Sequence, residues 1–141
     1  MSADTIHATT VAIDGRGVLI VGPSGSGKSD LALRLIDRGA VLVADDRTVL
    51  RVEGGTVLAS APATLVGSLE VRGLGIVALP HLAEVAVAMC VELARDVDRL
   101  PPPRTRSLLE IVVAEMVIDP RPASAPLLVE LMLAQPGAVV A

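Results

Sequence analysis

Short runs of β-branched residues alternate with turn sequences along the first part of the chain. Runs at 9–13 and 17–21 flank the triplet Asp-Gly-Arg, which favours a β-hairpin. The second run ends at a glycine-rich loop, residues 22–27. Apolar residues then recur at helical spacing over 28–38, and Gly39 stands in the position of a C-terminal cap. The pattern predicts a hairpin, a loop and a helix in that order.

A continuous apolar run at 40–44 is typical of a central strand covered on both faces, and it ends at Asp45 and Asp46. Later segments have the length or period of strands, and the last apolar segment has the pattern of a helix that ends at Pro136-Gly137. We expect strands at 48–52, 56–60 and 85–93, a strand or strand pair at 108–118, an exposed loop at the prolines 101–103, and a helix at 124–135. The chain is therefore predicted to be α/β, with a mixed sheet and hairpins.

The composition narrows the classes of protein that fit this pattern. A length of 141 residues, of which 52% are hydrophobic, fits a single domain over residues 1–141. Phe, Tyr and Trp are absent, so aliphatic side chains must fill the core, and no aromatic platform is available for stacking nucleic acid bases. A formal net charge of −4 adds no general attraction for phosphate backbones. We expect no nucleic acid partner.

The cysteine content and the N-terminal sequence bear on the cellular compartment. Cys90 is the only cysteine, so it cannot form an internal disulfide, and a buried structural role is expected. The opening MSADTIHATT has no basic region followed by an apolar one, and no apolar stretch is long enough to span a membrane. We expect a cytoplasmic protein that does not associate with membranes.

The strongest motif lies at residues 22–29, which fit the phosphate-loop pattern G-x-x-x-x-G-K-[ST] at every fixed position, between a predicted strand and a predicted helix. Glycines let backbone N–H groups point at phosphate oxygens, the lysine adds positive charge, and the serine hydroxyl can ligate Mg²⁺. Of the 12 lysines and arginines, Lys28 is the only lysine, which indicates that an ammonium group is required here. We predict that ATP or pyrophosphate is bound by Gly22, Pro23, Ser24, Gly25, Ser26, Gly27, Lys28 and Ser29.

Asp45 and Asp46 follow a predicted strand, at the kind of position where open α/β sheets place their sites. Adjacent residues of a strand point to opposite faces, so both carboxylates enter one site only if the chain turns there. One carboxylate could then hold Mg²⁺ while the other accepts a hydroxyl proton. The alternative is that one of the two only caps a turn.

Three further residues are candidates for the same site. Glu70 is an isolated carboxylate in a glycine-rich, apolar segment at 67–75. Arg72 lies on the same face if that segment is extended, and it could either pair with Glu70 or stabilise a transferring phosphoryl group. His7, just before the first predicted strand, could face the phosphate loop or have a hydrogen-bonded structural role.

The stretch from His7 to Ile76 resembles the catalytic domain of HPr kinase/phosphorylase, in the short form found in alphaproteobacteria. The similarity rests on IHAT, GVLIVGPSGSGKSDLALRLIDRGA, LVADD and LEVRGLGI, the last of which is close to the signature sequence of that family. A fainter likeness continues through 118–120 and 123–126. The resemblance implies a phosphate-loop fold akin to that of phosphoenolpyruvate carboxykinase, and so a phosphate-loop kinase domain.

The resemblance also implies an activity. It is the ATP- and Mg²⁺-dependent phosphorylation of a serine of HPr, the phosphocarrier protein of the sugar phosphotransferase system, with a reverse reaction in which inorganic phosphate removes that group and pyrophosphate leaves. Members are typically hexamers, so a homo-oligomer is implied. By position, Ser29, Asp45 and Glu70 would be associated with the metal ion, Asp46 would be the acid/base toward the serine hydroxyl, His7 would assist near the phosphoryl group, and Arg72 would belong to the signature turn.

One departure from the family concerns charge. Leu127 and Leu128 stand where relatives often carry a lysine, so that charge would have to come from Arg104, Arg106 or Arg121. Two other functions fit the phosphate loop itself. A regulatory module would sense ATP or pyrophosphate without transfer, and a kinase for a small metabolite would need no protein acceptor.

Overall fold

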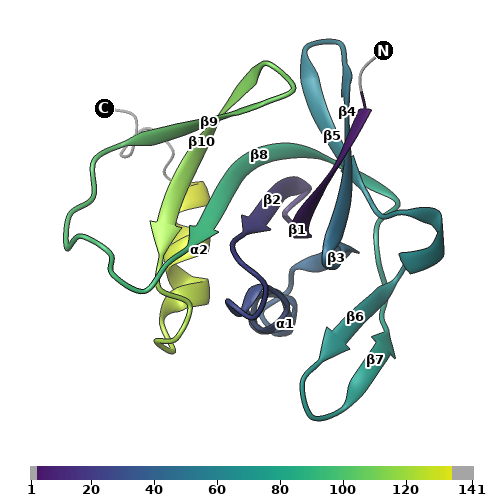
Figure 1. The fold of residues 1–141 in the computed structure, drawn as a ribbon, viewed down its shortest axis with the longest axis horizontal. Coiled ribbons are helices and arrows are strands. Elements are labelled where there is room, and N and C mark those ends of the chain that lie inside the picture. The colour runs from purple at the N-terminus through teal and green to yellow at the C-terminus, as the bar shows by residue number, and fades with distance from the viewer. Residues whose placement is uncertain (1–2, 135–141) are drawn as a thin grey trace.

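The computed structural model describes residues 3–134, which form a mixed α/β fold (Figure 1). A large sheet carries helix α1 (Lys28–Asp37), and a second helix, α2 (Ala125–Ala134), follows the last strand. A short helical turn at Ala63–Leu65 precedes a small two-stranded sheet. The strands are β1 (Ala3–Ile13), β2 (Arg16–Val21), β3 (Val41–Ala44), β4 (Arg47–Glu53), β5 (Thr56–Ser60), β6 (Ser68–Val71), β7 (Gly75–Ala78), β8 (Glu84–Leu93), β9 (Arg104–Leu108) and β10 (Ile111–Ile118).

The large sheet has the strand order β2-β1-β4-β5-β8-β10-β9, with β3 paired to β1 beside this path and β2 also paired to β8. The pairings β2–β1–β4–β5–β8–β2 therefore close into a ring. The pairs β2–β8 and β8–β10 are parallel, whereas the other pairs of this sheet are antiparallel. The carboxyl ends of β2, β8 and β10 consequently lie at one edge of the sheet, where the phosphate-loop sequence begins.

Alternating side chains of β2 separate two aliphatic cores. Val18 and Ile20 pack against α1 and α2 in one core, together with Leu31 and Val129. Leu19 and Val21 point the other way, into a second core that also contains the buried Cys90. Because alternate residues of a strand face opposite sides, a run of consecutive apolar residues can fill both cores at once.

Most locally encoded predictions are confirmed. The hairpins β1–β2 and β4–β5, helix α1 with Gly39 after it, strand β8 and the exposed prolines 101–103 all lie where they were predicted. Of the strand or strand pair predicted at 108–118, β10 is confirmed, whereas its partner β9 begins earlier, at Arg104, and the two strands meet at a turn over Leu109 and Glu110. The helix predicted at 124–135 is α2, while Gln135, Pro136 and Gly137 lie outside the described residues.

Two predictions of local structure are wrong. The run at 40–44 was predicted as a central strand, but β3 pairs with β1 and has only an isolated bridge, Leu42 to His81, on its other side. Its residues are buried because Leu42 packs in the core beside α1 and Val43 packs in the opposite core. His7 does not precede the first strand but lies within β1, because β1 extends to Ala3 by pairing with β4.

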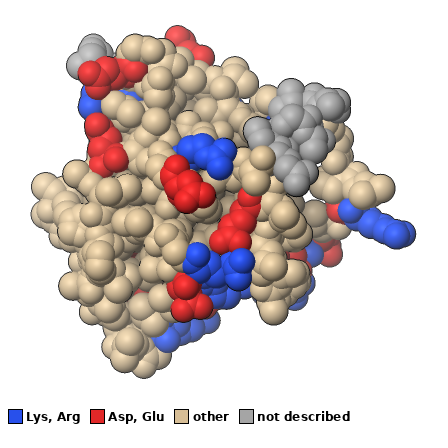
Figure 2. All heavy atoms as spheres, turned by 180° about the vertical axis from the view of Figure 1, so that it is seen from behind, with Lys and Arg blue, Asp and Glu red and all other residues tan. Residues whose placement is uncertain are grey.

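Charged side chains are spread over the surface as neighbouring pairs. On the face in Figure 2, acidic and basic side chains adjoin one another, and most of the surface between them is uncharged. Arg51, for example, bonds Glu84 through two nitrogens and Glu53 through a third contact. Among residues 3–134, no helix has the length and apolarity needed to cross a membrane.

Candidate functional site

The phosphate loop, residues 22–29, runs from the end of β2 into the first turn of α1. Gly25 and Gly27 have φ of 79° and 103°, values that side chains with a Cβ rarely adopt, so the curled backbone depends on glycine at these positions. The Lys28 ammonium donates to the carbonyl oxygens of Gly22 (2.9 Å) and Pro23 (3.1 Å), and Lys28 is only 7% exposed. The charge of Lys28 is thus held over the loop, as an anion site at a helix N-terminus requires.

Asp45 links three separate elements at the end of β3. Its Oδ1 accepts hydrogen bonds from the Ser29 hydroxyl at 2.6 Å and from the Thr9 hydroxyl at 3.0 Å, and its Oδ2 accepts one from the backbone N–H of Glu70 at 2.9 Å. The side chain is 7% exposed. These bonds satisfy a nearly buried carboxylate and fix it beside the first turn of α1.

Asp46 is directed differently from its neighbour. The chain turns at this point, as the sequence argument required for both acids to enter one site, and Asp46 has φ of 65°, in the left-handed region. Its side chain is exposed, and its backbone N–H donates to the Thr9 hydroxyl at 3.3 Å. Residues in such conformations are enriched at functional sites, and here the strain coincides with a solvent-facing carboxylate.

Thr9 was not singled out from the sequence, although it lies in the IHATT segment. It is fully buried, donates to Asp45 and accepts from the Asp46 backbone, so it positions both acids. The only sign of its role in the sequence was its position as a hydroxyl residue at the start of a predicted apolar strand. His7 lies two residues earlier on β1, opposite Arg47, and its side chain is exposed.

Glu70 and Arg72 lie in the β6–β7 hairpin, which extends away from the large sheet (Figure 1). The Glu70 backbone contacts Asp45, while its side chain is exposed. Arg72 is in the turn that follows β6 and is exposed, so the two residues are not consecutive members of one extended face as predicted. The hairpin therefore reaches the site through its main chain.

The oxygen atoms of Ser29 and Asp45 suit a hard divalent cation. Within residues 3–134, no three His, Cys, Asp or Glu side chains are arranged as a metal-ligand cluster. Mg²⁺ bound with a nucleotide usually takes one or two carboxylates, with phosphate oxygens and waters as its other ligands. The Ser29 hydroxyl and the Asp45 carboxylate, which are hydrogen-bonded to each other, are enough to meet this need for only a few protein ligands.

Two clefts adjoin the phosphate loop, the first at Gly22 and the second at residues 23–27. The first, of about 510 Å³, is lined by the start of β1, the end of β2 and strand β9, and includes His7, Gly22, Glu92 and Arg106. The second, of about 520 Å³, lies between the loop and the residues that follow β8 and β10. Both volumes fall in the range of roughly 300–1,000 Å³ that is typical of small-molecule sites.

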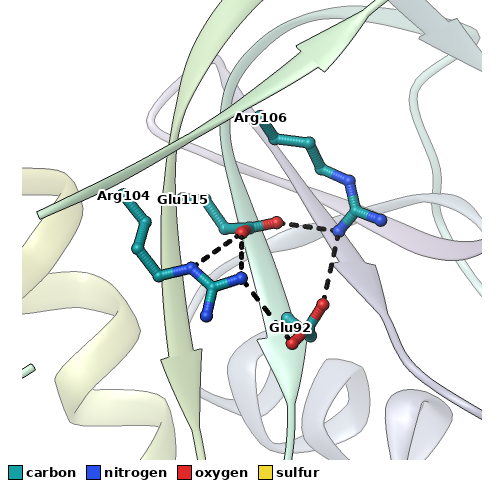
Figure 3. A network of polar contacts seen from close by, with 4 residues as sticks. All are labelled: Glu92, Arg104, Arg106 and Glu115. Carbon is teal, nitrogen blue, oxygen red and sulfur yellow. Dashed lines mark hydrogen bonds and ion pairs between the residues drawn. The ribbon is translucent and has the colours of Figure 1, made fainter.

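Glu92 and Arg106, which line the first cleft, belong to a network of two carboxylates and two guanidinium groups (Figure 3). Glu115, only 4% exposed, contacts Arg104 at 2.9 Å and Arg106 at 2.8 Å, and Glu92 lies 3.9 Å from both arginines. The arginines neutralise a buried carboxylate that would otherwise be costly to desolvate. Arg104 and Arg106 were predicted as sources of charge, but their pairing with Glu115 was not predictable, since Glu115 resembles a polar residue of an exposed strand face.

The second cleft is bordered by an ion pair that follows β10. Asp119 accepts four hydrogen bonds from Arg121, three from the guanidinium and one from the backbone, between 2.7 and 3.2 Å. These bonds hold the pKa of Asp119 at about 2. The pair therefore stays ionised throughout the physiological pH range.

Similarity to known proteins agrees with this geometry. The family model described as the HPr serine kinase C-terminal domain matches residues 1–118. The chain belongs to this family. The resemblance to this family inferred from the sequence motifs is therefore confirmed. A solved structure of the Hpr(Ser) kinase/phosphatase from Coxiella burnetii matches 96% of this chain and 97% of its own, with a TM-score of 0.83 and 31% identity. This match confirms the mixed α/β fold with a large mixed sheet.

Curated relatives in the family are longer than this chain. It is 35% identical over 130 residues to the HPr kinase/phosphorylase of Clostridium tetani, and 37% identical over 131 residues to that of Bacillus licheniformis. Each alignment covers 83% of this chain but only 43% and 42% of the relative. A relative from Clostridium botulinum, 46% identical over 77 residues, is covered over 25% of its length. The chain thus spans less than half the length of these curated relatives.

Proposed function

We propose that the chain is a protein-serine kinase that transfers the γ-phosphoryl group of ATP to a serine of HPr, and that residues 1–141 act as a single phosphate-loop kinase domain. The observation that carries the proposal is the contact of Ser29 with Asp45, with Asp46 exposed beside it in a left-handed turn. A phosphate loop alone accounts for nucleotide binding. Transfer to a hydroxyl also needs a group that accepts the hydroxyl proton, and the exposed carboxylate of Asp46 supplies it.

In this reaction the serine hydroxyl oxygen attacks the γ-phosphorus, the bond from that phosphorus to the bridging oxygen breaks, and ADP leaves. Asp46 accepts the hydroxyl proton, because its carboxylate is exposed and makes no hydrogen bond within the described residues. Lys28 and the loop N–H groups hold the phosphates during transfer. His7, in the same cleft wall as Gly22, assists near the phosphoryl group.

We assign the metal site to Ser29 and Asp45, with Glu70 as a third member if its carboxylate turns toward them. When bound, Mg²⁺ would neutralise charge on the phosphate oxygens, as in other phosphoryl transfer enzymes. Asp45 is held for that role by Thr9 and by the Glu70 backbone. Arg72, in the exposed turn of the hairpin, is proposed to contact the phosphoryl group or the acceptor protein.

The proposal has further parts, some implied by family membership and some by the composition of the chain. The fold is assigned to the phosphoenolpyruvate carboxykinase type of phosphate-loop fold. The reverse reaction, in which inorganic phosphate removes the phosphoryl group of phosphoserine and pyrophosphate leaves, would use the same loop. We further propose a homo-oligomer, a cytoplasmic location where ATP and HPr are available, and no nucleic acid or membrane partner.

The test is incubation of the purified chain with γ-labelled ATP, Mg²⁺ and HPr. We expect label on HPr with the wild-type chain, and none on an HPr variant in which the acceptor serine is alanine. Unlabelled HPr, with ATP binding by the chain intact, would refute the kinase and favour a nucleotide-sensing module. Turnover of ATP with a small metabolite in the absence of HPr would favour a metabolite kinase instead.

A further inference from the structure

The second cleft beside the phosphate loop has no role in the reaction as described so far. We propose that this cleft, between the loop and the residues that follow β8 and β10, binds the nucleoside of ATP, and that arginine guanidinium groups take the place of an aromatic platform for the base. The inference rests on the proposed function, because it concerns the nucleotide that the loop would hold.

The position of the acids decides which cleft receives the nucleoside. In phosphoryl transfer, the attacking and leaving oxygens lie roughly in line on opposite sides of the phosphorus. The acceptor must therefore enter from the side of the proton-accepting Asp46, and ADP must leave on the other side. The first cleft is lined by His7, whose backbone pairs with Arg47 directly after Asp46. The second cleft, on the side of β8 and β10, is left for the nucleoside.

The lining of the second cleft continues directly from the phosphate loop. Its residues include Pro23 through Gly27, so a nucleotide whose phosphates lie on the loop can extend into it without leaving the protein surface. Apolar surface is supplied by Leu93, Ala94 and Pro120. Pro120 would be 3.6 Å from a Cβ placed on Gly27, so the far wall of the cleft packs closely against the loop.

Three arginines line the same cleft, one each from α1, the end of β8 and the end of β10: Arg34, Arg95 and Arg121. A guanidinium group is planar and weakly hydrated, and it stacks on the faces of π-systems. In a chain without Phe, Tyr or Trp, it is the only flat side chain besides histidine that can cover the face of a base. Both histidines lie elsewhere, since neither lines this cleft.

Two of these arginines are held in place before any ligand binds. Arg34 donates to the carbonyl oxygens of Pro120 at 2.6 Å and Pro122 at 3.3 Å, and it contacts Asp30 at 3.0 Å. Arg121 is held by the three guanidinium bonds to Asp119. Preorganised groups lose less conformational entropy when a ligand binds.

The proposal is tested by comparing ADP with pyrophosphate, since only ADP carries a nucleoside. Isothermal titration calorimetry with Mg²⁺ would measure both affinities for the wild-type chain and for Arg121→Ala. We expect the variant to bind ADP about tenfold more weakly, in keeping with the loss of one desolvated cation–π contact. Its affinity for pyrophosphate should stay within about twofold of wild type, which also shows that the variant is folded.

The matched control is Arg51→Ala, which removes another arginine held by two bonds to one carboxylate, on β4 and outside both clefts. Its ADP affinity should not change. Arg106→Ala tests the opposite assignment, because Arg106 lines the first cleft. A selective loss of ADP affinity in Arg106→Ala would place the nucleoside in the first cleft and overturn the proposal.

A second readout does not depend on a variant. Photolabelling with 8-azido-ATP, followed by mass spectrometry of proteolytic peptides, should modify residues 93–95 or 119–121. Label confined to residues 4–7 or 106–109 would overturn the proposal, as would a wild-type chain that binds ADP no better than pyrophosphate. Failure of the wild-type chain to bind either ligand would instead refute the proposed function on which the inference rests.

Discussion

Asp45 and Asp46 are adjacent in the chain but have opposite environments. Asp45 is 7% exposed and accepts three hydrogen bonds, whereas Asp46 has an exposed side chain and a φ of 65°. The fixed carboxylate is suited to a constant charge beside a metal ion. The exposed one is suited to gaining and losing a proton. The division of roles therefore follows from a single left-handed residue.

At Asp46, we expect Asp46→Asn to leave ATP binding nearly unchanged and to lower the transfer rate by about 10²–10⁴-fold, the range for loss of a general base. Asparagine tolerates the left-handed conformation, so the turn should survive. Binding is measured by calorimetry and transfer by labelled ATP with HPr. If Asp45→Asn shows this separation and Asp46→Asn does not, the two assignments are reversed.

Cys90 is buried in the core opposite α1, and burial raises the pKa of its thiol to about 12. Because the thiolate is the reactive form, the native chain should resist iodoacetamide at pH 8 and react only when it unfolds. Alkylation is measured as a shift in the mass of the chain, and because Cys90 is the only cysteine, this shift reports on Cys90 alone. Rapid, stoichiometric alkylation of the folded chain would contradict the burial described here.

At the scale of elements, the neighbouring strands β9 and β10 are joined by ion pairs as well as by backbone bonds. Glu115 on β10 contacts both Arg104 and Arg106 on β9. The side chains of Arg104 and Arg106 are 45% and 36% exposed, so they retain water when the carboxylate is lost. The cost of breaking this network should then lie below that of a fully buried pair.

We expect Glu115→Gln to lower the free energy of unfolding by about 1–3 kcal/mol, because it removes a charge that two guanidinium groups solvate. Urea denaturation measures the change. The control is Glu53→Gln, which removes an exposed partner of Arg51 and should cost less than about 1 kcal/mol. If both substitutions lowered the free energy of unfolding equally, burial of Glu115 would not contribute to stability.

Sequence patterns predicted those elements whose signals are local. The β1–β2 hairpin and α1 each have their turn residues and apolar period within about 20 positions, and both are confirmed, with the glycine-rich loop between β2 and α1. The place of β3 was not predictable, because an apolar run shows burial but not which strand pairs with it. The Glu115 network was missed for a similar reason, since its partners reach it through pairing of β9 with β10.

The candidate site was predicted in part. Ser29 and Asp45 were named together, and the structure brings them within 2.6 Å although 16 residues separate them. Thr9 was missed, because its role depends on the antiparallel pairing of β1 with β3. The second cleft could not be foreseen from the sequence, since the residues that line it come from three distant segments that meet only where β2, β8 and β10 end side by side.

At the scale of the whole molecule, parallel pairing of β2 with β8, and of β8 with β10, brings the phosphate loop to one edge of the sheet between two clefts. The first cleft is lined by His7, near the acids, and the second is lined by three arginines. In the proposed reaction, this arrangement would separate the phosphoryl acceptor from the nucleoside while both reach the same loop. The central claim is therefore that this loop holds a polyphosphate together with a divalent ion.

Calorimetric titration of the folded chain with pyrophosphate, with and without Mg²⁺, tests that claim most directly. The ammonium of Lys28 and the oxygens of Ser29 and Asp45 lie together at the loop, so binding should be saturable and Mg²⁺-dependent. In Lys28→Ala it should weaken at least about tenfold, because a charge-assisted contact to phosphate is lost. Absence of heat with the wild-type chain, or equal affinity in Lys28→Ala, would contradict the account.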